Sequence, residues 1–188
     1  MVIGSSFPVN SVYKKCTMKK IFFPLLMLIS ASAFTQTNTP PCSAPEASQF
    51  DFWIGEWDLH WQDSLRGSNR VERVFGNCAV QENFLNPKTG YSGKSWSVYN
   101  SNYKLWQQTW IDSQGGYIHL TGRMTGDSLI LYTEERTVPA SVSPTGKMKN
   151  RMVYYNIKKD SFDWSWEAST DSGLSWKPSW QIHYARRK

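Results

Sequence analysis

The sequence lacks the residue patterns that most often mark an enzyme or a metal centre. Its three histidines, His60, His119 and His183, are scattered, and no H-x-H or H-x-x-x-H pair occurs. There is no G-x-S-x-G segment around an activated serine and no glycine-rich phosphate loop. These absences argue against common zinc sites, α/β-hydrolases and P-loop nucleotide binding, and we expect no metal site.

The chain also lacks a hydrophobic run of the roughly twenty residues that a helix needs to cross a bilayer. The apolar run at residues 21–29 has nine residues, follows Lys19-Lys20 and precedes Ala31-Ser32-Ala33. This order is typical of a secretory signal peptide. We therefore predict an upstream extension plus signal peptide at 1–33, with translation starting at Met1 or Met18. The exported protein would be periplasmic or extracellular, without stable membrane insertion after signal removal.

Basic charge is scarce once this leader is removed. The whole chain carries 21 Lys and Arg against 15 Asp and Glu, and four of these lysines precede residue 34. Only residues 186–188 form a basic cluster, whereas nucleic-acid binding needs a concentrated basic face. We therefore expect no nucleic-acid partner.

Cysteine is scarce too, and only Cys42 and Cys78 follow the leader. An isolated pair in an oxidising compartment is more often bonded than free. A disulfide would tie the segment ahead of the first strand to the second strand. The alternative is a pair of buried free thiols.

What the chain has in abundance is the period-two alternation of β-strands. Trp57, Leu59 and Trp61 alternate with polar residues, and turn residues then recur about every eight to twelve positions. The pattern predicts a first strand at 56–62, a second at 69–84 with a bulge at Gly76-Asn77, and no helix after residue 50. Seven further strands are expected at 91–100, 104–112, 117–124, 128–136, 148–158, 161–169 and 176–187.

Short connections between these strands favour a meander. About nine such strands predict an all-β fold, an antiparallel up-and-down β-barrel over residues 43–188, after a polar linker at 34–42. Ser43, Pro45 and Glu46 form a capping pattern that predicts a short helix from 45 to 50. A two-sheet sandwich is the alternative fold.

Gly55-Glu56-Trp57 on the first strand resembles the G-x-W opening of lipocalin and calycin barrels. In those families the tryptophan packs at the closed end beneath an arginine from the last strand. The resemblance implies a lipocalin-like barrel in which Arg186 or Arg187 takes that place.

A longer pattern resembles a bacterial exported domain family of unknown function with an FDFWxGxW opening. It comprises FDFWIGEW at 50–57, Gly76-Asn77-Cys78 with Glu82, WQQTWIDSQGG at 106–116 and SWEASTDSGLSW at 165–176. The resemblance spans residues 42–187, fits a Cys42–Cys78 pair and implies no established activity. Residues 169–176 are also similar to the Asp-box hairpin of sialidase-type propellers. We interpret Asp171, Gly173 and Trp176 as structural, together with Gly55 and Trp57.

All ten tryptophans follow residue 50, and several pairs are spaced by two or four, which places both rings on one face of a strand. Such rings either fill a small barrel or line a ligand cavity, where indole N–H groups find polar partners. The predicted ligand-binding residues combine these rings with polar neighbours: Gln108, Trp110, His119, Trp166 and Glu167.

Three functional hypotheses follow. The first is an exported barrel that binds a small molecule in an aromatic-lined cavity. The second is a hydrolase or lyase acting on a sugar or lipid-like substrate, with acid–base candidates Glu82, His119, Glu167 and His183. The third is a structural module with a filled barrel. We expect no cofactor, with haem held by His183 as a narrower alternative, and the volume of any cavity separates the hypotheses.

Overall fold

The computed structural model describes residues 40–188, so the predicted leader and most of the linker lie outside the described residues. Within 40–188 there are eleven strands and two short 3-10 helices, η1 (Pro45–Ser48) and η2 (Asp51–Trp53). Neither of these helices is long and apolar enough to span a membrane.

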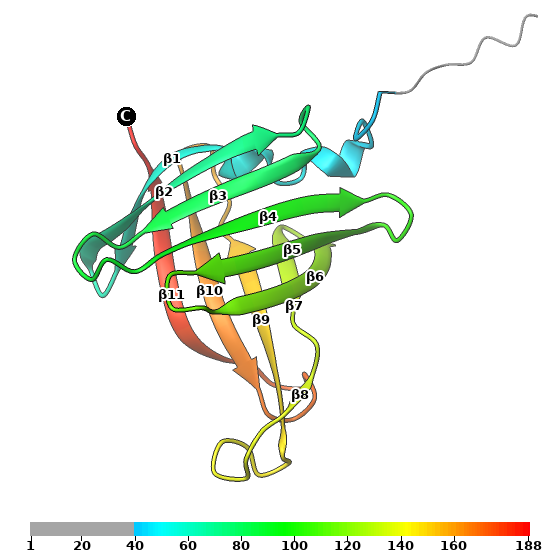
Figure 1. Cartoon of the computed structure of the whole chain (residues 1–188), viewed down its shortest axis with the longest axis vertical. Coiled ribbons are helices and arrows are strands. Elements are labelled where there is room, and N and C mark those ends of the chain that lie inside the picture. Colours follow the sequence, from blue (N-terminus) through cyan, green and yellow to red (C-terminus); the bar gives the residue numbers. More distant parts are fainter. Residues whose placement is uncertain (1–39) are drawn as a thin grey trace, which may run out of the picture. The chain divides into compact units, whose positions relative to one another are not determined.

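Ten of the strands form one closed antiparallel barrel (Figure 1). They are β1 (Gly55–Trp61), β2 (Ser64–Val74), β3 (Ala79–Leu85), β4 (Ser92–Asn100), β5 (Leu105–Asp112), β6 (Tyr117–Thr125), β7 (Ser128–Tyr132), β9 (Lys147–Tyr155), β10 (Ser161–Ser169) and β11 (Lys177–Arg186). Each pairs with the next along the chain, except that β7 pairs with β9, because β8 (Arg136–Thr137) is only a two-residue strand beside β9. The pairing of β11 with β1 closes the barrel and excludes the sandwich.

The predicted up-and-down barrel is therefore confirmed. The prediction of a single strand at 69–84 is wrong. This segment belongs to two strands, β2 and β3, because residues 75–78 form a turn rather than a bulge. Phe75, Gly76 and Asn77 have φ of 52°, 64° and 71°. Three successive residues in the left-handed region reverse the chain direction, whereas a bulge would only bend it.

The predicted helix at 45–50 is also corrected in detail. The structure forms η1 and η2 instead, and the first is preceded by Ala44, with no side-chain cap from Ser43. Pro45 does begin the helix, as expected, and Ser48 Oγ donates a hydrogen bond to the Pro45 carbonyl at 2.7 Å. Segments this short favour the tighter 3-10 geometry over an α-helix with a capping box.

The aromatic stretch at residues 50–57 closes one end of the barrel. Phe50, Trp53 and Trp57 are almost completely buried. The Phe50 ring packs edge-on against Trp106 and Tyr154, with ring centroids 4.6 and 5.4 Å apart. Trp57 Nε1 donates to the Trp53 carbonyl at 2.8 Å, so the backbone of the plug satisfies this indole.

Arg186 covers this plug. Its guanidinium carbon lies 4.2 Å from the centroid of the Trp57 ring, and its Nη1 and Nη2 donate to the carbonyls of Ile54 and Phe52 at 2.8 and 3.1 Å. A Cβ on Gly55, where φ is +136°, would lie 2.3 Å from Arg186 Nη1, so only glycine fits beneath the guanidinium. Arg186 is thus the arginine over the tryptophan, while Arg187 bonds the Asp58 carboxylate.

The hairpin between β10 and β11 is organised by Asp171. Its carboxylate accepts hydrogen bonds from Ser169 Oγ at 2.7 Å and from the Ser175 amide at 2.9 Å. Bonds from Ser175 hold the pKa of Asp171 well below its usual range. Trp176 Nε1 donates to the Gly173 carbonyl at 3.1 Å, which fits the structural interpretation of this segment.

The Cys42–Cys78 disulfide is present and joins residues separated by 36 positions. It links the segment preceding η1 to the turn between β2 and β3. The predicted bond is confirmed, and the alternative of two free thiols is excluded.

Replacing Trp57 by Ala should lower the free energy of unfolding by about 3–5 kcal/mol, because the ring fills the closed end. Urea denaturation measures the loss. The matched control is Trp96→Ala on the outer face of β4, where the ring is only partly buried and the loss should be about 1 kcal/mol. Equal losses in the two variants would contradict the plug.

Replacing Cys42 and Cys78 together by Ser should lower the free energy of unfolding by about 4 kcal/mol, because the bond restrains a long loop of the unfolded chain. Denaturation of the wild type with reductant should then coincide with the double variant. A variant as stable as the oxidised wild type would show that the bond contributes nothing.

Candidate functional site

A cavity of about 230 Å³ lies inside the barrel, away from the plug. Along β5, Trp106 contacts Phe50 at the closed end, whereas Trp110, four residues further, reaches the cavity. Along β10, Phe162 packs on Trp57 and Trp166 reaches the cavity. The lining residues are Glu82, Phe84, Tyr91, Trp110, Ile118, Met152, Tyr154, Trp164, Trp166, Trp180, Ile182 and Tyr184.

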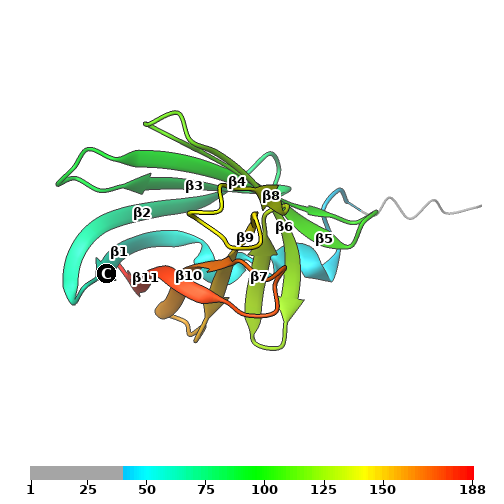
Figure 2. The same cartoon turned by 90° about the horizontal axis from the view of Figure 1, so that it is seen from below.

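These side chains come from strands on opposite sides of the barrel. β3 passes on one side of the barrel and β10 and β11 on the other (Figure 2). Alternate residues of each strand face inward, and the register places Trp164 opposite Ile182 and Trp166 opposite Trp180. Glu82, Tyr154 and Tyr184 are buried and form the floor.

The rim of the cavity is formed by half-buried aromatic side chains held from behind. The Trp110 ring lies directly over Gly93, where a Cβ would approach within 2.1 Å of the indole. Asp112 Oδ2 accepts hydrogen bonds from Trp110 Nε1 and from Tyr91 Oη, both at 3.1 Å. The close contact with Gly93 therefore orients the Trp110 ring, and the shared Asp112 carboxylate orients the rings of Trp110 and Tyr91.

The aromatic rings that line the cavity pack against one another edge to face. Trp164 and Trp180 have ring centroids 5.4 Å apart at 83°, and Phe84 contacts Trp110 at 6.0 Å and Trp180 at 6.1 Å, both near perpendicular. Such pairs are favourable beyond the area they bury, and they hold each ring in place. The cavity is therefore preformed rather than created by a ligand.

Glu82 is the one acidic residue among the lining side chains. Its Oε1 accepts from Asn69 Nδ2 and its Oε2 from Ser95 Oγ, both at 2.6 Å. Burial raises the pKa of Glu82 from 4.5 to about 7, and the bonds from Ser95 and Asn69 only partly oppose this rise. At neutral pH the carboxyl therefore exists in both protonation states.

Polar groups behind the floor leave two amide oxygens without a hydrogen-bond donor. Gln108 Nε2 donates to Ser97 Oγ at 2.8 Å, and Asn69 Nδ2 also approaches Tyr184 Oη at 3.4 Å. Within residues 40–188, three buried side-chain polar atoms have no partner: the Asn69 and Gln108 amide oxygens and Trp53 Nε1 at the closed end. The Asn69 oxygen lies beside Glu82, whereas the Gln108 oxygen lies one layer closer to the plug.

The cavity brings together only two of the five residues predicted to bind a ligand. Trp110 and Trp166 line it. Gln108 is buried inside the barrel but sits one layer closer to the plug. His119 is exposed on the outer face of β6, and Glu167 faces outward in an ion pair with Arg151 at 2.6 Å.

The four acid–base candidates do not converge. Glu82 faces the interior, whereas Glu167 and His119 lie outside the wall. His183 is also on the outer face, with Nδ1 2.7 Å from Asp163 Oδ1. The cavity lining therefore contains no histidine that could ligate haem, and the described residues contain no group of three or more metal-binding side chains.

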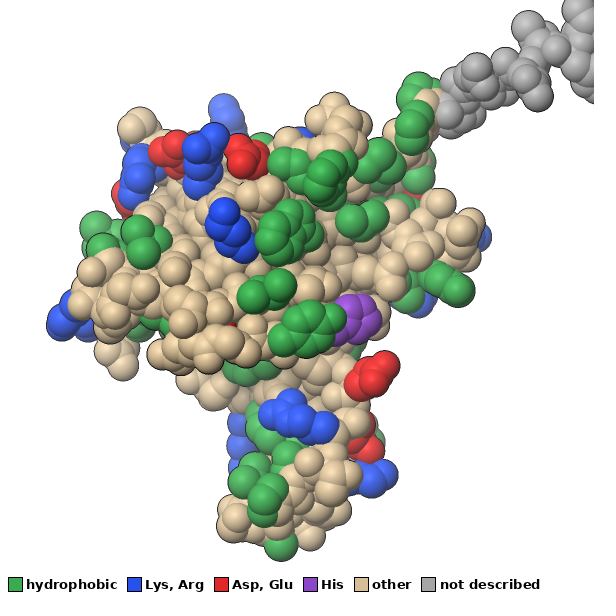
Figure 3. All heavy atoms as spheres, viewed as in Figure 1, with side chains coloured by type: hydrophobic (Ala, Val, Ile, Leu, Met, Phe, Trp, Pro, Cys, Tyr) green, Lys and Arg blue, Asp and Glu red, His purple; other side chains and the backbone are tan. Residues whose placement is uncertain are grey.

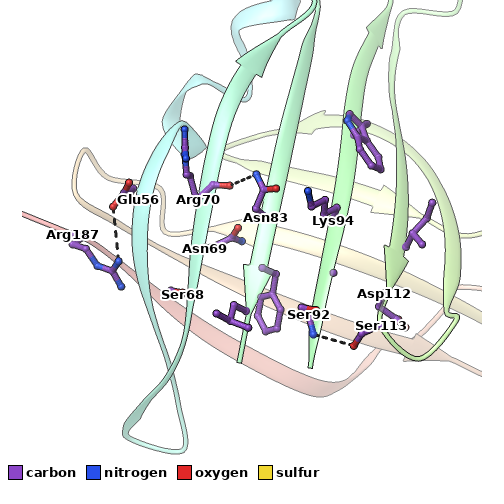
Figure 4. Close-up of a pocket in the computed structure, with 15 residues that line it drawn as sticks. Glu56, Ser68, Asn69, Arg70, Asn83, Ser92, Lys94, Asp112, Ser113 and Arg187 are labelled. Carbon is purple, nitrogen blue, oxygen red and sulfur yellow. Dashed lines mark hydrogen bonds and ion pairs between the residues drawn. The ribbon is translucent and has the colours of Figure 1, made fainter. Parts of the chain in front are cut away.

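A second hollow of about 570 Å³ lies on the outer surface across β2–β5 (Figure 4). Several of its polar side chains have partners: Asn83 Nδ2 donates to the Arg70 carbonyl at 3.2 Å, and Arg187 lies 3.9 Å from Glu56. On this side of the barrel, basic and acidic side chains gather at the upper left, and hydrophobic side chains lie over the middle (Figure 3). The hollow is larger but open, and we assign the candidate site to the interior cavity, where polar groups are desolvated.

Sequence reasoning identified Glu82 only as an acid–base candidate and missed its place in the cavity. The period-two pattern could have placed Glu82 inside the barrel, since Glu82 shares one face of β3 with the hydrophobic residues Val80 and Phe84. An acidic residue between two inward hydrophobic residues is the expected mark of a buried carboxyl. Trp164 and Trp180 were recognised only as members of aromatic pairs.

No protein-family model matches the chain, and a search of curated proteins found no significant match. The site is therefore interpreted from its own geometry.

Stability should fall as pH rises between about 4.5 and 7 because of Glu82. Its pKa is raised to about 7 by burial, so in this window the folded protein holds a proton that the unfolded chain releases. The contribution is full below about pH 4.5 and lost above about pH 7, a change of about 3 kcal/mol.

Denaturation of the wild type and of Glu82→Gln at pH 5 and pH 8.5 measures this change. The variant should lack the decline, whereas Glu46→Gln, at an exposed position, should decline as the wild type does. Parallel pH profiles for the wild type and Glu82→Gln would contradict a protonated buried carboxyl.

Proposed function

We propose that this is an exported barrel that binds a small, partly apolar molecule in its interior cavity. The observation that carries the proposal is a preformed space lined by aromatic residues around one buried carboxyl, Glu82. Apolar walls with a few converging polar groups are the usual composition of a small-molecule site. A filled barrel would leave no space of about 230 Å³.

The dimensions of the cavity support a ligand at the small end of the usual range. Small-molecule pockets commonly measure about 300–1,000 Å³, and this one is slightly below that range. A single aromatic ring with a short polar arm suits it. The ring would pack between Trp164, Trp166 and Trp180, and the polar arm would reach Glu82.

Export is supported by the disulfide and by the predicted signal peptide. The Cys42–Cys78 bond suits an oxidising compartment such as the periplasm or the exterior. The lipocalin-like relationship is part of the same proposal. It is supported by the Arg186 guanidinium over Trp57 at the closed end of the barrel.

Catalysis is the second candidate function, favoured by one observation. A carboxyl with a pKa of about 7, as at Glu82, is suited to general acid–base work near neutral pH. Its weakness is that the cavity lining offers no second acid, base or nucleophile besides tyrosines. A binding role requires no such partner.

Filling the cavity should abolish binding. Ile118→Trp places an indole in the cavity, whereas Ile111→Trp makes the same change on the exposed outer face of neighbouring β5. Isothermal titration calorimetry with 2-phenylethylammonium, 2-phenylethanol and 3-phenylpropionate tests three ligands of similar size and different charge. At least one should bind with 1:1 stoichiometry to the wild type and to Ile111→Trp, and none to folded Ile118→Trp.

A wild type that binds none of the three would overturn the proposal. So would undiminished binding by Ile118→Trp, because the ligand would then lie elsewhere. Near-ultraviolet circular dichroism confirms that each variant is folded.

A further inference from the structure

We infer that the ligand of the interior cavity is a small organic cation, a protonated primary amine carried on an aromatic or apolar body. This inference rests on the proposed function and adds the chemical class of the ligand. It is carried by three features of the cavity: its charge, its hydrogen-bonding groups and its aromatic faces.

The charge of the cavity is uncompensated. Glu82 is buried, and none of the twelve lining residues is Lys, Arg or His. The half-buried Glu167 on the outer face, by contrast, has Arg151 as a basic partner. A buried carboxylate without a counter-ion is costly, and a cationic ligand removes that cost.

The hydrogen-bonding groups also favour a ligand that donates. The ionised Glu82 carboxylate accepts hydrogen bonds, and the amide oxygen of Asn69, whose Nδ2 donates to Glu82, has no partner. A primary ammonium carries three N–H donors and no acceptor. An anion would place a second negative charge beside ionised Glu82, and a neutral alcohol supplies one donor.

The walls supply the third feature. Trp110, Trp164, Trp166 and Trp180 all line the cavity, and tryptophan is the most effective aromatic partner for a cation. Edge-to-face packing fixes the orientation of the rings around the cavity. The barrel already uses this chemistry at its other end, where Arg186 lies over Trp57.

Binding of the cation should be linked to proton release. The titratable groups that face Glu82 are Tyr154 from β9 and Tyr184 from β11, with Tyr91 at the rim. Burial raises the pKa of Tyr154 and Tyr184 well above 10 and that of Tyr91 to about 12, so these groups stay neutral. Glu82 is then the group that loses a proton when an ammonium binds beside it.

The test compares 2-phenylethylammonium with 2-phenylethanol by calorimetry in phosphate and in HEPES buffers. At pH 7 the ammonium should bind at least about tenfold more tightly and release about half a proton, since the pKa of Glu82 is about 7. At pH 8.5 the release should approach zero and the affinity should rise about twofold. 3-Phenylpropionate should bind more weakly than either.

Glu82→Gln should weaken binding of the ammonium by about 30-fold and abolish proton release, while the alcohol changes by less than about threefold. The control is Glu167→Gln, the same substitution on the outer face, which should leave both affinities unchanged. Near-ultraviolet circular dichroism and binding of the alcohol show that the Glu82→Gln cavity is intact.

The outcomes separate the two proposals. The inference of a cationic ligand is overturned if the alcohol or the propionate binds as tightly as the ammonium, or if Glu82→Gln leaves the ammonium affinity unchanged. The proposal of a binding cavity would then still stand. Failure of all three compounds to bind overturns the binding cavity itself, and with it the cation.

Discussion

Arg186 lies over the Trp57 ring and joins the last strand of the barrel to the first. Its guanidinium carbon is 4.2 Å from the ring centroid, while its nitrogens bind two carbonyls of the segment that precedes β1. Gly55 leaves the space for this contact. Since β1 and β11 are the pair that closes the sheet, this contact reinforces closure and seals one end of the barrel. An open interior space can then exist only toward the opposite end.

The two ends use similar side chains for different purposes. At the plug, Phe50, Trp53 and Trp57 pack without leaving space, and their backbone satisfies the Trp57 indole. At the open end, Trp110 is held by Gly93 and Asp112, which keep the ring at the rim. Rings held in this way preserve a cavity that hydrophobic collapse would otherwise close. Preorganisation of this kind lowers the entropic cost of binding a ligand.

Sequence patterns predicted the closed barrel and the disulfide, because these depend on strand period, turn residues and cysteine count. The structural role of Trp57 was implied by the resemblance to G-x-W barrels. The β2–β3 turn was mistaken for a bulge because Phe75 and Asn77, as well as Gly76, have left-handed backbone angles, which the sequence pattern did not predict. His119 and Glu167 were placed in the site because period two gives the two faces of a strand but not which one is inside. The cavity depends on the space left between rings from different strands, and a local sequence pattern does not predict the size of that space.

Glu82 connects stability to binding. Burial raises its pKa to about 7, so ionisation of this carboxyl destabilises the free protein at neutral and alkaline pH. Hydrogen bonds from Asn69 and Ser95 reduce the cost without supplying a charge. A purely structural interior would be more stable with a neutral residue of similar size at this position, as buried charges are seldom the most stable choice. Under the proposal of a cationic ligand, the same ionisation that weakens the empty barrel strengthens its attraction for that ligand.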